Sequence, residues 1–355
     1  MDLPTRRLGR TGLVVPAFGF GGIPIGREDI EDAPAADVIR RAIEGGMTLI
    51  DTFSGYGRSE ARIGMAIRGR RQRVTIVTKA FVSLGAEGFV EMVEGSLKTM
   101  GIECIDVLLI KNVDSAAGVQ RAAEHAETLA KLRRQGKARF GGLSSHSPEH
   151  ARAAIEAGFI DVAEVPWNYA NPSFEAVLDL AADQDVGILA MKPLGGGRLF
   201  GDLPQEGAPE SLDTLIDALS FAVSHRAGAV AIPGIGSEAE LDRYLEAAPR
   251  VRPLTDDQKQ RLTVAAMDFG DDFCRACGYC RSVCPAGLPI DEILPLLDRF
   301  KHVRTDHTFQ SELKRRFAAL KLDGAACREC RKCVEECPFD LPIPERLKEA
   351  LEALA

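Results

Sequence analysis

Residues 105–110 read Ile-Asp-Val-Leu-Leu-Ile, an almost unbroken apolar run that ends at Lys111-Asn112. A run without alternating polar residues is typical of a parallel strand that is buried on both faces. Residues 74–78, Val-Thr-Ile-Val-Thr, are a second example. Eight such segments are predicted as strands: Leu13–Phe20, Met47–Asp51, Val74–Thr78, Cys104–Ile110, Ala138–Leu143, Val162–Pro166, Gly187–Met191 and Ala229–Ile232.

Amphipathic segments separate the predicted strands, and many carry helix-end signals such as a capping serine, an early proline or a closing glycine. The predicted helices are Ala35–Glu44, one from Ser59, Glu87–Met100, Val119–Arg134, one from Ser147 to near Gly158, Pro172–Gln184, Ser211–Ser224 and Ser237–Ala247. Strict alternation of eight strands and eight helices predicts an α/β fold, either a (β/α)8 barrel or a doubly wound sheet. No helix directly follows Phe18-Gly-Phe-Gly-Gly22, so the dinucleotide-binding fingerprint of the wound sheet is absent and a barrel is favoured.

Length and composition bound the rest of the molecule. The 355 residues suffice for a barrel and a small second domain. The boundary is predicted at Pro249–Thr255, giving a barrel over 1–254 and a second domain over 255–355 that begins with a helix at Asp256–Phe269. A net charge of −8 argues against nucleic acid as a partner. No long apolar run predicts a membrane span, and the first residues lack a signal core, so a cytoplasmic protein is expected.

Eight of the nine cysteines follow residue 273 and form two copies of C-x2-C-x2-C-x3-C-P. This spacing is the bacterial ferredoxin signature for [4Fe–4S] ligation, in which the fourth cysteine of each motif binds the other cluster. Zinc and disulfides are the alternatives, but zinc sites pair C-x2-C units and cytosolic proteins rarely keep disulfides. Two clusters are therefore predicted, one on Cys274, Cys277, Cys280 and Cys337, the other on Cys327, Cys330, Cys333 and Cys284.

The spacer between the cysteine motifs, Pro285–Ala326, is long for a β-type ferredoxin. Within it Ile293, Leu294, Leu297 and Phe300 recur at helical spacing. The tail therefore resembles the α-helical ferredoxin module of iron–sulfur subunits in succinate dehydrogenase-type enzymes.

Several motifs in residues 5–250 resemble those of aldo/keto reductases and occur in the same order. They are the opening Arg6–Gly22 stretch, Asp51-Thr-Phe-Ser-Gly-Tyr56-Gly-Arg-Ser-Glu60, Val77-Thr78-Lys79, Gly136–Ser145, Ala190–Gly197 and Ile232-Pro-Gly234. The resemblance implies an oxidoreductase that uses a nicotinamide cofactor on a small carbonyl or sugar-like hydroxy compound.

Asp51, Tyr56 and Lys79 are the candidate catalytic residues, at or just past the ends of two predicted strands. Tyr56 can protonate a carbonyl oxygen as a general acid, although its ordinary pKa near 10 is high for that task. An ammonium at Lys79 would favour the tyrosinate, and Asp51 would orient that ammonium. The alternative is a surface tyrosine beside a structural Asp51–Lys79 ion pair.

Lys111 stands where the resemblance implies a catalytic histidine. A lysine there can donate to a substrate oxygen, lower the pKa of Tyr56, or act as a neutral nucleophile beside the charge of Lys79. A side chain that points to solvent is the plain alternative.

The resemblance also implies cofactor contacts, some at altered residues. Ser145 replaces an asparagine, Glu164 a glutamine and Met191 a stacking aromatic, while Gly234 and Glu240 replace basic residues that bind the 2′-phosphate of NADP. NAD(H) is therefore favoured over NADP(H). The candidate cofactor residues are Gly21, Gly22, Ser144, Ser145, Glu164, Met191, Lys192, Pro193, Leu194, Gly195, Gly234, Ser237 and Glu240.

Three functions fit these motifs. In the first, a nicotinamide-dependent oxidoreductase exchanges electrons with a carrier protein through its clusters. Nicotinamide moves two electrons and a cluster moves one, and no flavin motif is evident to mediate. In the second, an ordinary reductase carries structural or redox-sensing clusters. In the third, the barrel is non-catalytic and the tail is an electron-transfer or docking module. The sequence predicts neither the substrate nor the oligomeric state.

Overall fold

The computed structural model describes residues 3–195, 209–259, 262, 273–274, 279–302, 307–320, 322, 327–337 and 339–355. The chain divides into two compact units, Met1–Leu194 with Glu206–Lys259, and Gly195–Gln205 with Gln260–Ala355. Most of the helix predicted at residues 256–269 lies outside the described residues. Among the helices of the described residues, none combines the length and the apolar character that crossing a bilayer requires.

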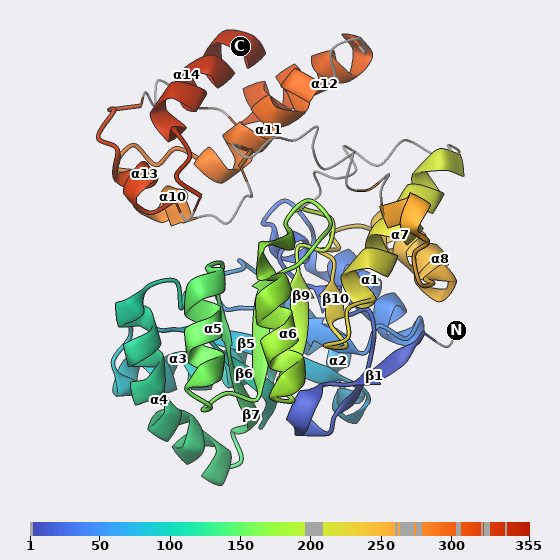
Figure 1. Cartoon of the computed structure of the whole chain (residues 1–355), viewed down its shortest axis with the longest axis vertical. Helices are drawn as coiled ribbons and strands as arrows, with labels where there is room; N and C mark the ends of the chain where they lie inside the picture. Colours follow the sequence, from blue (N-terminus) through green and yellow to red (C-terminus); the bar gives the residue numbers. More distant parts are fainter. Residues whose placement is uncertain are drawn as a thin grey trace. The chain divides into compact units, whose positions relative to one another are not determined.

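The first unit is built on an eight-stranded parallel sheet in the order β10-β9-β8-β7-β6-β5-β4-β3 (Figure 1). Bridges from Phe18 to Ala231 and from Gly21 to Gly234 join the first strand to the last, so the sheet closes into a barrel. The strands are β3 (Phe20–Gly21), β4 (Leu49–Asp51), β5 (Thr75–Phe81), β6 (Ile105–Lys111), β7 (Ala138–Ser144), β8 (Val162–Pro166), β9 (Gly187–Met191) and β10 (Val230–Ile232).

The prediction of one strand over Leu13–Phe20 is wrong, because the segment divides into two. β2 (Val14–Pro16) pairs antiparallel with β1 (Thr5–Arg7), whereas β3 pairs within the barrel. The chain changes partner at Gly19, whose amide donates to Ala231 O at 2.8 Å. A Cβ at Gly19 would lie 2.7 Å from the Ile232 side chain and 3.0 Å from Leu49 O, so a larger residue here would have to displace its neighbours.

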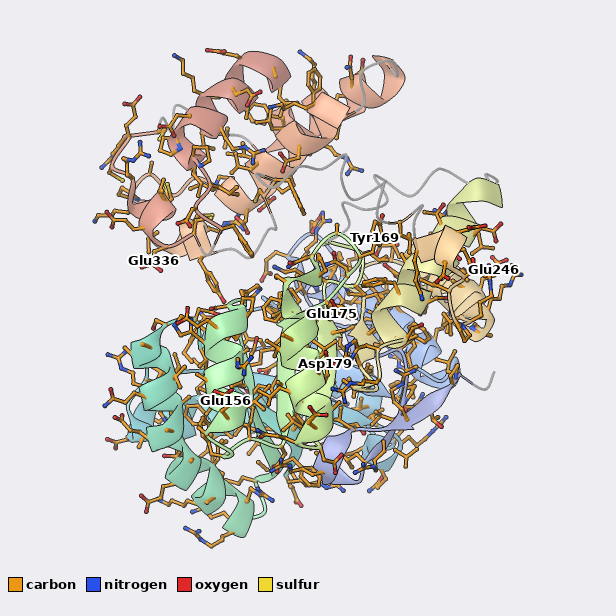
Figure 2. The ribbon with its side chains drawn as sticks, viewed as in Figure 1. Glu156, Tyr169, Glu175, Asp179, Glu246 and Glu336 are labelled. Atoms are coloured by element: carbon orange, nitrogen blue, oxygen red, sulfur yellow. The ribbon has the colours of Figure 1, made fainter. Side chains whose placement is uncertain are left out.

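Helices surround the strands of the barrel (Figure 1). They are α1 (Asp32–Glu44), α2 (Ser59–Ile67), α3 (Ala86–Met100), α4 (Ala116–Arg134), α5 (Pro148–Glu156), α6 (Glu175–Asp183), α7 (Pro209–Val223) and α8 (Glu238–Ala247). α6 illustrates their amphipathic design: Val177 and Leu178 are buried, while Glu175 and Asp179 lie along its outer side (Figure 2). The predicted (β/α)8 barrel is confirmed.

An apolar layer fills the barrel near the amino ends of its strands. It contains Leu8 and Val15 from the β1–β2 hairpin together with Leu49, Val77, Val107, Leu109, Val162, Leu189, Val230 and Ile232. The hairpin therefore contributes to the same core as the strands. Because side chains alternate along a strand, residues two positions further on face the same interior at the carboxyl end.

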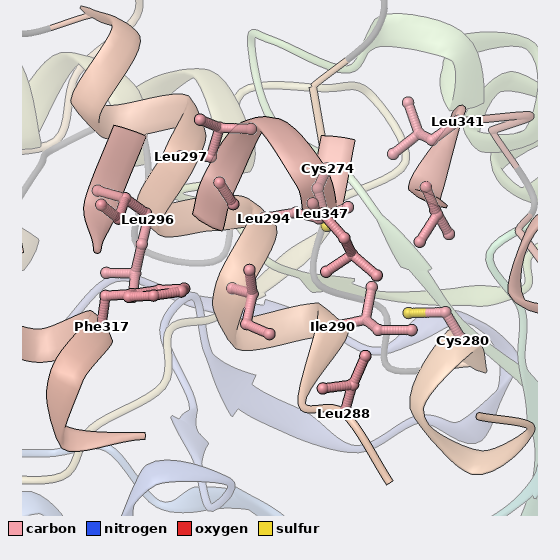
Figure 3. Packing of buried hydrophobic residues seen from close by; sticks show 14 of the residues in the cluster. Cys274, Cys280, Leu288, Ile290, Leu294, Leu296, Leu297, Phe317, Leu341 and Leu347 are labelled. Atoms are coloured by element: carbon pink, nitrogen blue, oxygen red, sulfur yellow. The ribbon is translucent and has the colours of Figure 1, made fainter. Parts of the chain in front are cut away.

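The second unit is helical in its described part. Its helices are α10 (Tyr279–Ser282), α11 (Ile290–His302), α12 (His307–Ala319), α13 (Lys332–Glu335) and α14 (Ile343–Leu354). α11 packs against α12 and α14, and α10 lies against α13. Cys274 and Cys280 belong to the same buried cluster as Ile290, Leu294 and Leu347 (Figure 3). The cysteine-rich segments are thus part of this unit's core.

Candidate functional site

The interior alternation brings four charged side chains to the carboxyl end of the barrel. Asp51, Lys79, Lys111 and Glu164 each follow by two residues a member of the apolar layer, on β4, β5, β6 and β8. Carboxyl ends of barrel strands are where active sites of this fold lie. The fold therefore builds the candidate site from strand ends that are far apart in the sequence.

Lys79 is the centre of this group and its side chain is 1% exposed. Its Nζ is in contact with the Asp51 carboxylate and lies 3.0 Å from Glu164 Oε2. It also donates to the carbonyl oxygen of Thr52 at 3.1 Å. The sequence analysis predicted that Asp51 orients Lys79. The structure adds a second carboxylate, Glu164, which was not predicted to contact Lys79.

Burial and charge act in opposite directions on these groups. Burial alone would lower the pKa of Lys79, but Asp51 and Glu164 raise it above its ordinary value, so the side chain is an ammonium. Burial and then the charge of Glu164 raise the pKa of Asp51 to about 7, against the opposing effect of Lys79. The site therefore holds a permanent cation between two carboxylates, one of which titrates near neutrality.

Tyr56 lies on the loop after β4, with its ring centroid 5.6 Å from Lys79 Nζ. Burial raises the pKa of Tyr56, and the Lys79 charge opposes that effect. A Cβ at Gly26 would lie 1.8 Å from the Tyr56 carbonyl oxygen, so this glycine permits the loop to approach. Arg62, 1% exposed, holds the facing loop by donating to Ile25 O at 2.7 Å and to Arg27 O at 2.8 Å.

Lys111 is partly buried, and its side chain faces the aromatic rings of the barrel mouth. Its Nζ lies 5.2 Å from the Phe53 ring centroid and 6.0 Å from that of Tyr56. Burial, followed by the charge of Lys79, lowers the pKa of Lys111, while Glu164 opposes the effect. The structure thus brings Lys111 together with the other three predicted catalytic residues.

His146 is a site residue that sequence reasoning missed. It follows β7, is 4% exposed, and its Nε2 lies 3.1 Å from Lys192 Nζ. An ammonium only donates, so Nε2 is the acceptor. Burial and the charges of Lys192 and Lys111 lower the pKa of His146 well below its ordinary value. A histidine directly after Ser144-Ser145 at a predicted strand end was the available signal.

Ser145, predicted as a cofactor contact, is engaged by the loop after β6. Its hydroxyl lies 2.7 Å from Val113 O and 2.9 Å from Asp114 Oδ1. Lys192 has a left-handed backbone, φ 55°, and its carbonyl oxygen accepts from Asn168 at 2.9 Å. The other predicted residues of these strand ends, all buried, are Ser144, Met191, Pro193, Leu194 and Gly195.

The loops after β3 and β10 contain the remaining predicted cofactor residues. Gly22 donates its amide to Asp51 O at 2.8 Å, and a Cβ at Gly21 would lie 2.7 Å from Pro233 O. Ser237 caps α8 by accepting from the Glu240 amide, and Glu240 Oε2 accepts from the Gly236 amide at 2.7 Å. Gly234 is exposed. A carboxylate therefore stands at the start of α8, where an anion would otherwise meet free amides.

The described cysteines of the second unit line one pocket or pack in its apolar cluster, and three of them do both. Cys284, Cys327, Cys330 and Cys333 line one pocket with Pro285 and Ile290, and burial together with the neighbouring cysteines raises the pKa of Cys333. Cys277 lies outside the described residues, and the cysteines that belong to or pack against the apolar cluster of this unit are Cys274, Cys280, Cys284, Cys327, Cys333 and Cys337. No three described His, Cys, Asp or Glu side chains are arranged to hold a single metal ion. A cubane binds its thiolates at four separate corners, so four thiols around one pocket suit it.

Comparison with known proteins agrees with both units. A model of the aldo/keto reductase family matches residues 17–215, and one of the 4Fe-4S dicluster domain matches residues 273–342. A protein of Glycine max assigned as an aldo-keto reductase is 28% identical, over 57% of this chain and 63% of its own length, so the chain spans less than two thirds of that relative.

Two solved structures add to this. One, assigned as an aldo-keto reductase of Pseudomonas aeruginosa, has 29% identity and a TM-score of 0.60, covering 70% of this chain and 95% of its own. An aldo-keto reductase of Klebsiella pneumoniae in complex with NADPH has 22% identity and a TM-score of 0.61, covering 74% and 94%, which shows the shared fold. With a family match over more than half of its length, this chain belongs to the aldo/keto reductase family, whose members are oxidoreductases, and it also carries a 4Fe-4S dicluster domain.

Proposed function

We propose that the barrel interconverts a small carbonyl compound, or its sugar-like hydroxy form, in a nicotinamide-dependent reaction in which Tyr56 transfers the proton. The observation that carries this proposal is the buried Lys79, held between two carboxylates with its ammonium 5.6 Å from the Tyr56 ring centroid. A fixed cation beside a phenol is suited to stabilise the negative charge left when that phenol gives up its proton.

The proposed roles follow from the positions of the side chains. Bound reduced nicotinamide supplies a hydride to the carbonyl carbon. The Tyr56 hydroxyl gives its proton to the carbonyl oxygen, so the carbonyl gains a hydride and a proton and becomes an alcohol. Lys79 and Lys111 stabilise the resulting tyrosinate, and Asp51 keeps Lys79 charged. Phe53, which packs edge-on against Tyr56 at 5.4 Å, fixes the ring and excludes water from one side.

The proposed cofactor is NADH in preference to NADPH, bound by the strand-end residues and loops predicted for it. The Klebsiella relative was solved with NADPH. In this chain Glu240 places a carboxylate at the start of α8, and Gly234 offers no cation. A carboxylate repels a 2′-phosphate but can accept a hydrogen bond from a ribose 2′-hydroxyl.

We propose two [4Fe–4S] clusters, bound by the two cysteine sets predicted above. The pocket lined by Cys284 with Cys327, Cys330 and Cys333 supports the crossed assignment of the second set. Each cluster, when bound, exchanges one electron, which fits a role in electron transfer with a carrier protein.

A structural role is the second candidate, because Cys274, Cys280 and Cys333 are members of the buried core of their unit. Cluster binding would then contribute directly to the folding of a small helical unit.

The test uses protein that is purified anaerobically and whose iron and sulfide content has been measured. Fluorescence titration with NADH and NADPH measures binding, and a panel of small aldehydes, ketones and sugars measures turnover with the clusters oxidised or reduced by dithionite. NADH binding with carbonyl turnover is expected. No binding of either nucleotide at millimolar concentration would overturn the barrel function. Turnover that is indifferent to cluster redox state would favour the structural role.

A further inference from the structure

We infer that Glu164 and Lys111 are a matched pair of charges in the barrel mouth: Glu164 is a second counter-ion of Lys79, and Lys111 offsets the negative charge that Glu164 adds. Glu164 thereby becomes a positioning residue for Lys79.

The geometry of Glu164 carries the first half of this inference. Its side chain, on β8, is 3% exposed, and Oε2 lies 3.0 Å from Lys79 Nζ, whereas Asp51 contacts Lys79 from β4. Lys79 is thus held from β4 and from β8 at once. The ammonium thus has a carboxylate on two sides: it donates a hydrogen bond to Asp51, and Glu164 Oε2 adds a second negative charge at 3.0 Å.

The balance of charges in the barrel mouth supports the second half of the inference, the role of Lys111. At pH 8, above the pKa of about 7 of Asp51, the charges of Asp51 and Lys79 cancel, so Glu164 alone would leave one uncompensated negative charge in a buried site, which is costly. Lys111, on β6 next to β5, brings a positive charge into the same mouth, because its Nζ lies 6.0 Å from the Tyr56 ring centroid and Lys79 Nζ lies 5.6 Å from that centroid. Glu164 and Asp51 both act on Lys111 electrostatically, and Lys111 acts on Asp51 in return.

Other charged groups also face Lys111, and they bear on the choice of partner. His146 is neutral near pH 7, and Lys192 is directed at it, so neither balances a positive charge. Asp114 is the rival counter-ion, but its electrostatic effect on Lys111 is smaller than those of Glu164 and Asp51. Its Oδ1 is engaged at the loops after β6 and β7, where it accepts from Ser145 Oγ at 2.9 Å and from the His146 amide at 2.5 Å. We therefore assign the balance to Glu164.

A double-mutant cycle on the full-length, iron-loaded protein tests the pair. Thermal unfolding of the barrel is followed through Trp167, the only tryptophan, at pH 8 for Glu164→Gln, Lys111→Met and the double variant. Each single change is expected to lower the Tm by about 4 °C or more, and the double variant to recover most of that loss. Lys111→Arg, which keeps the charge, should retain the wild-type Tm.

Asp106→Asn combined with Lys111→Met is the matched control. Asp106 is a buried carboxylate on the same strand, five residues away or about 16 Å along it, so its effect should simply add to that of Lys111→Met. If the Tm losses of Glu164→Gln and Lys111→Met simply add in the double variant, the inference is overturned. Recovery of the Tm of Lys111→Met by Asp114→Asn, in place of Glu164→Gln, would overturn it as well.

A second readout serves if Glu164→Gln does not fold. Tyrosinate absorbance at alkaline pH, with the Tyr56→Phe spectrum subtracted, reports the ionisation of Tyr56. Tyr56 should ionise at a lower pH in Lys111→Arg, which keeps its positive charge at alkaline pH, than in the uncharged Lys111→Met variant. Equal curves for the two variants would show that the charge of Lys111 has no such role. None of these measurements depends on nicotinamide turnover, so they stand apart from the proposed function.

Discussion

Replacing Lys79 by methionine removes the cation on which the barrel mouth depends. The side chain is 1% exposed, and the change leaves the Asp51 and Glu164 carboxylates buried without the ammonium between them. Breaking a buried ion pair in this way costs about 3–5 kcal/mol. For a domain of this size that corresponds to a loss of roughly 6–20 °C in Tm.

The loss should depend on pH in a defined direction. Burial already raises the pKa of Asp51 to about 7, above its unfolded value of 3.8. A raised folded-state pKa contributes stability at pH values below the unfolded pKa, and that stability is lost as pH rises through the folded pKa. Without Lys79 the pKa of Asp51 rises further. The difference in free energy of unfolding between the variant and the wild type should therefore be small at pH 5 and large at pH 8.

Urea unfolding followed by Trp167 fluorescence is the assay, because the single tryptophan lies in the barrel and is 3% exposed. Lys98→Met, on the exposed side of α3, is the matched control and should change stability by about 0.5 kcal/mol at most. A Lys79→Met protein as stable as the control, or a gap that is the same at pH 5 and pH 8, would refute the electrostatic description of the site.

Two further predictions concern the cofactor and the helical unit. Glu240→Arg replaces a carboxylate that repels the 2′-phosphate with a cation, so it should raise the affinity for NADPH about tenfold or more in a fluorescence titration. Glu238→Arg, on the exposed first turn of the same helix, should not. Equal effects of the two variants would mean that Glu240 does not face the 2′-position. Asp298 accepts a hydrogen bond from the Cys274 amide at 2.9 Å and forms an ion pair with the buried Arg346. Asp298→Asn should therefore lower the iron that each chain retains on gel filtration, whereas the exposed Asp340→Asn should not. An unchanged iron content in Asp298→Asn would contradict this anchoring role.

The sequence was sufficient for the features that depend on local pattern. Strand periodicity and strand-end position predicted that Asp51, Tyr56 and Lys79 would meet, and the structure brings them together. The helices begin and end close to their predicted residues because capping serines and terminal glycines act locally. The cysteine spacing predicted an iron–sulfur domain, and a 4Fe-4S dicluster model matches it.

Features that depend on which strands become neighbours were not predictable. The split of residues 13–20 reflects a change of pairing partner from β1 to β10, which hydropathy cannot reveal. The contact of Glu164 with Lys79 joins β8 to β5 across the barrel interior, and the contact of His146 with Lys192 joins the ends of β7 and β9. These contacts depend on how the strands are arranged in space, which the local sequence pattern does not contain.

The most direct test of the account is a comparison of Tyr56→Phe with the wild type in anaerobic, iron-loaded protein supplied with NADH and a turned-over carbonyl compound. If Tyr56 provides the proton, kcat should fall by about 10²–10⁴ while NADH binding stays within twofold of the wild type. Retention of kcat within tenfold, with NADH binding intact, would contradict the proposed chemistry.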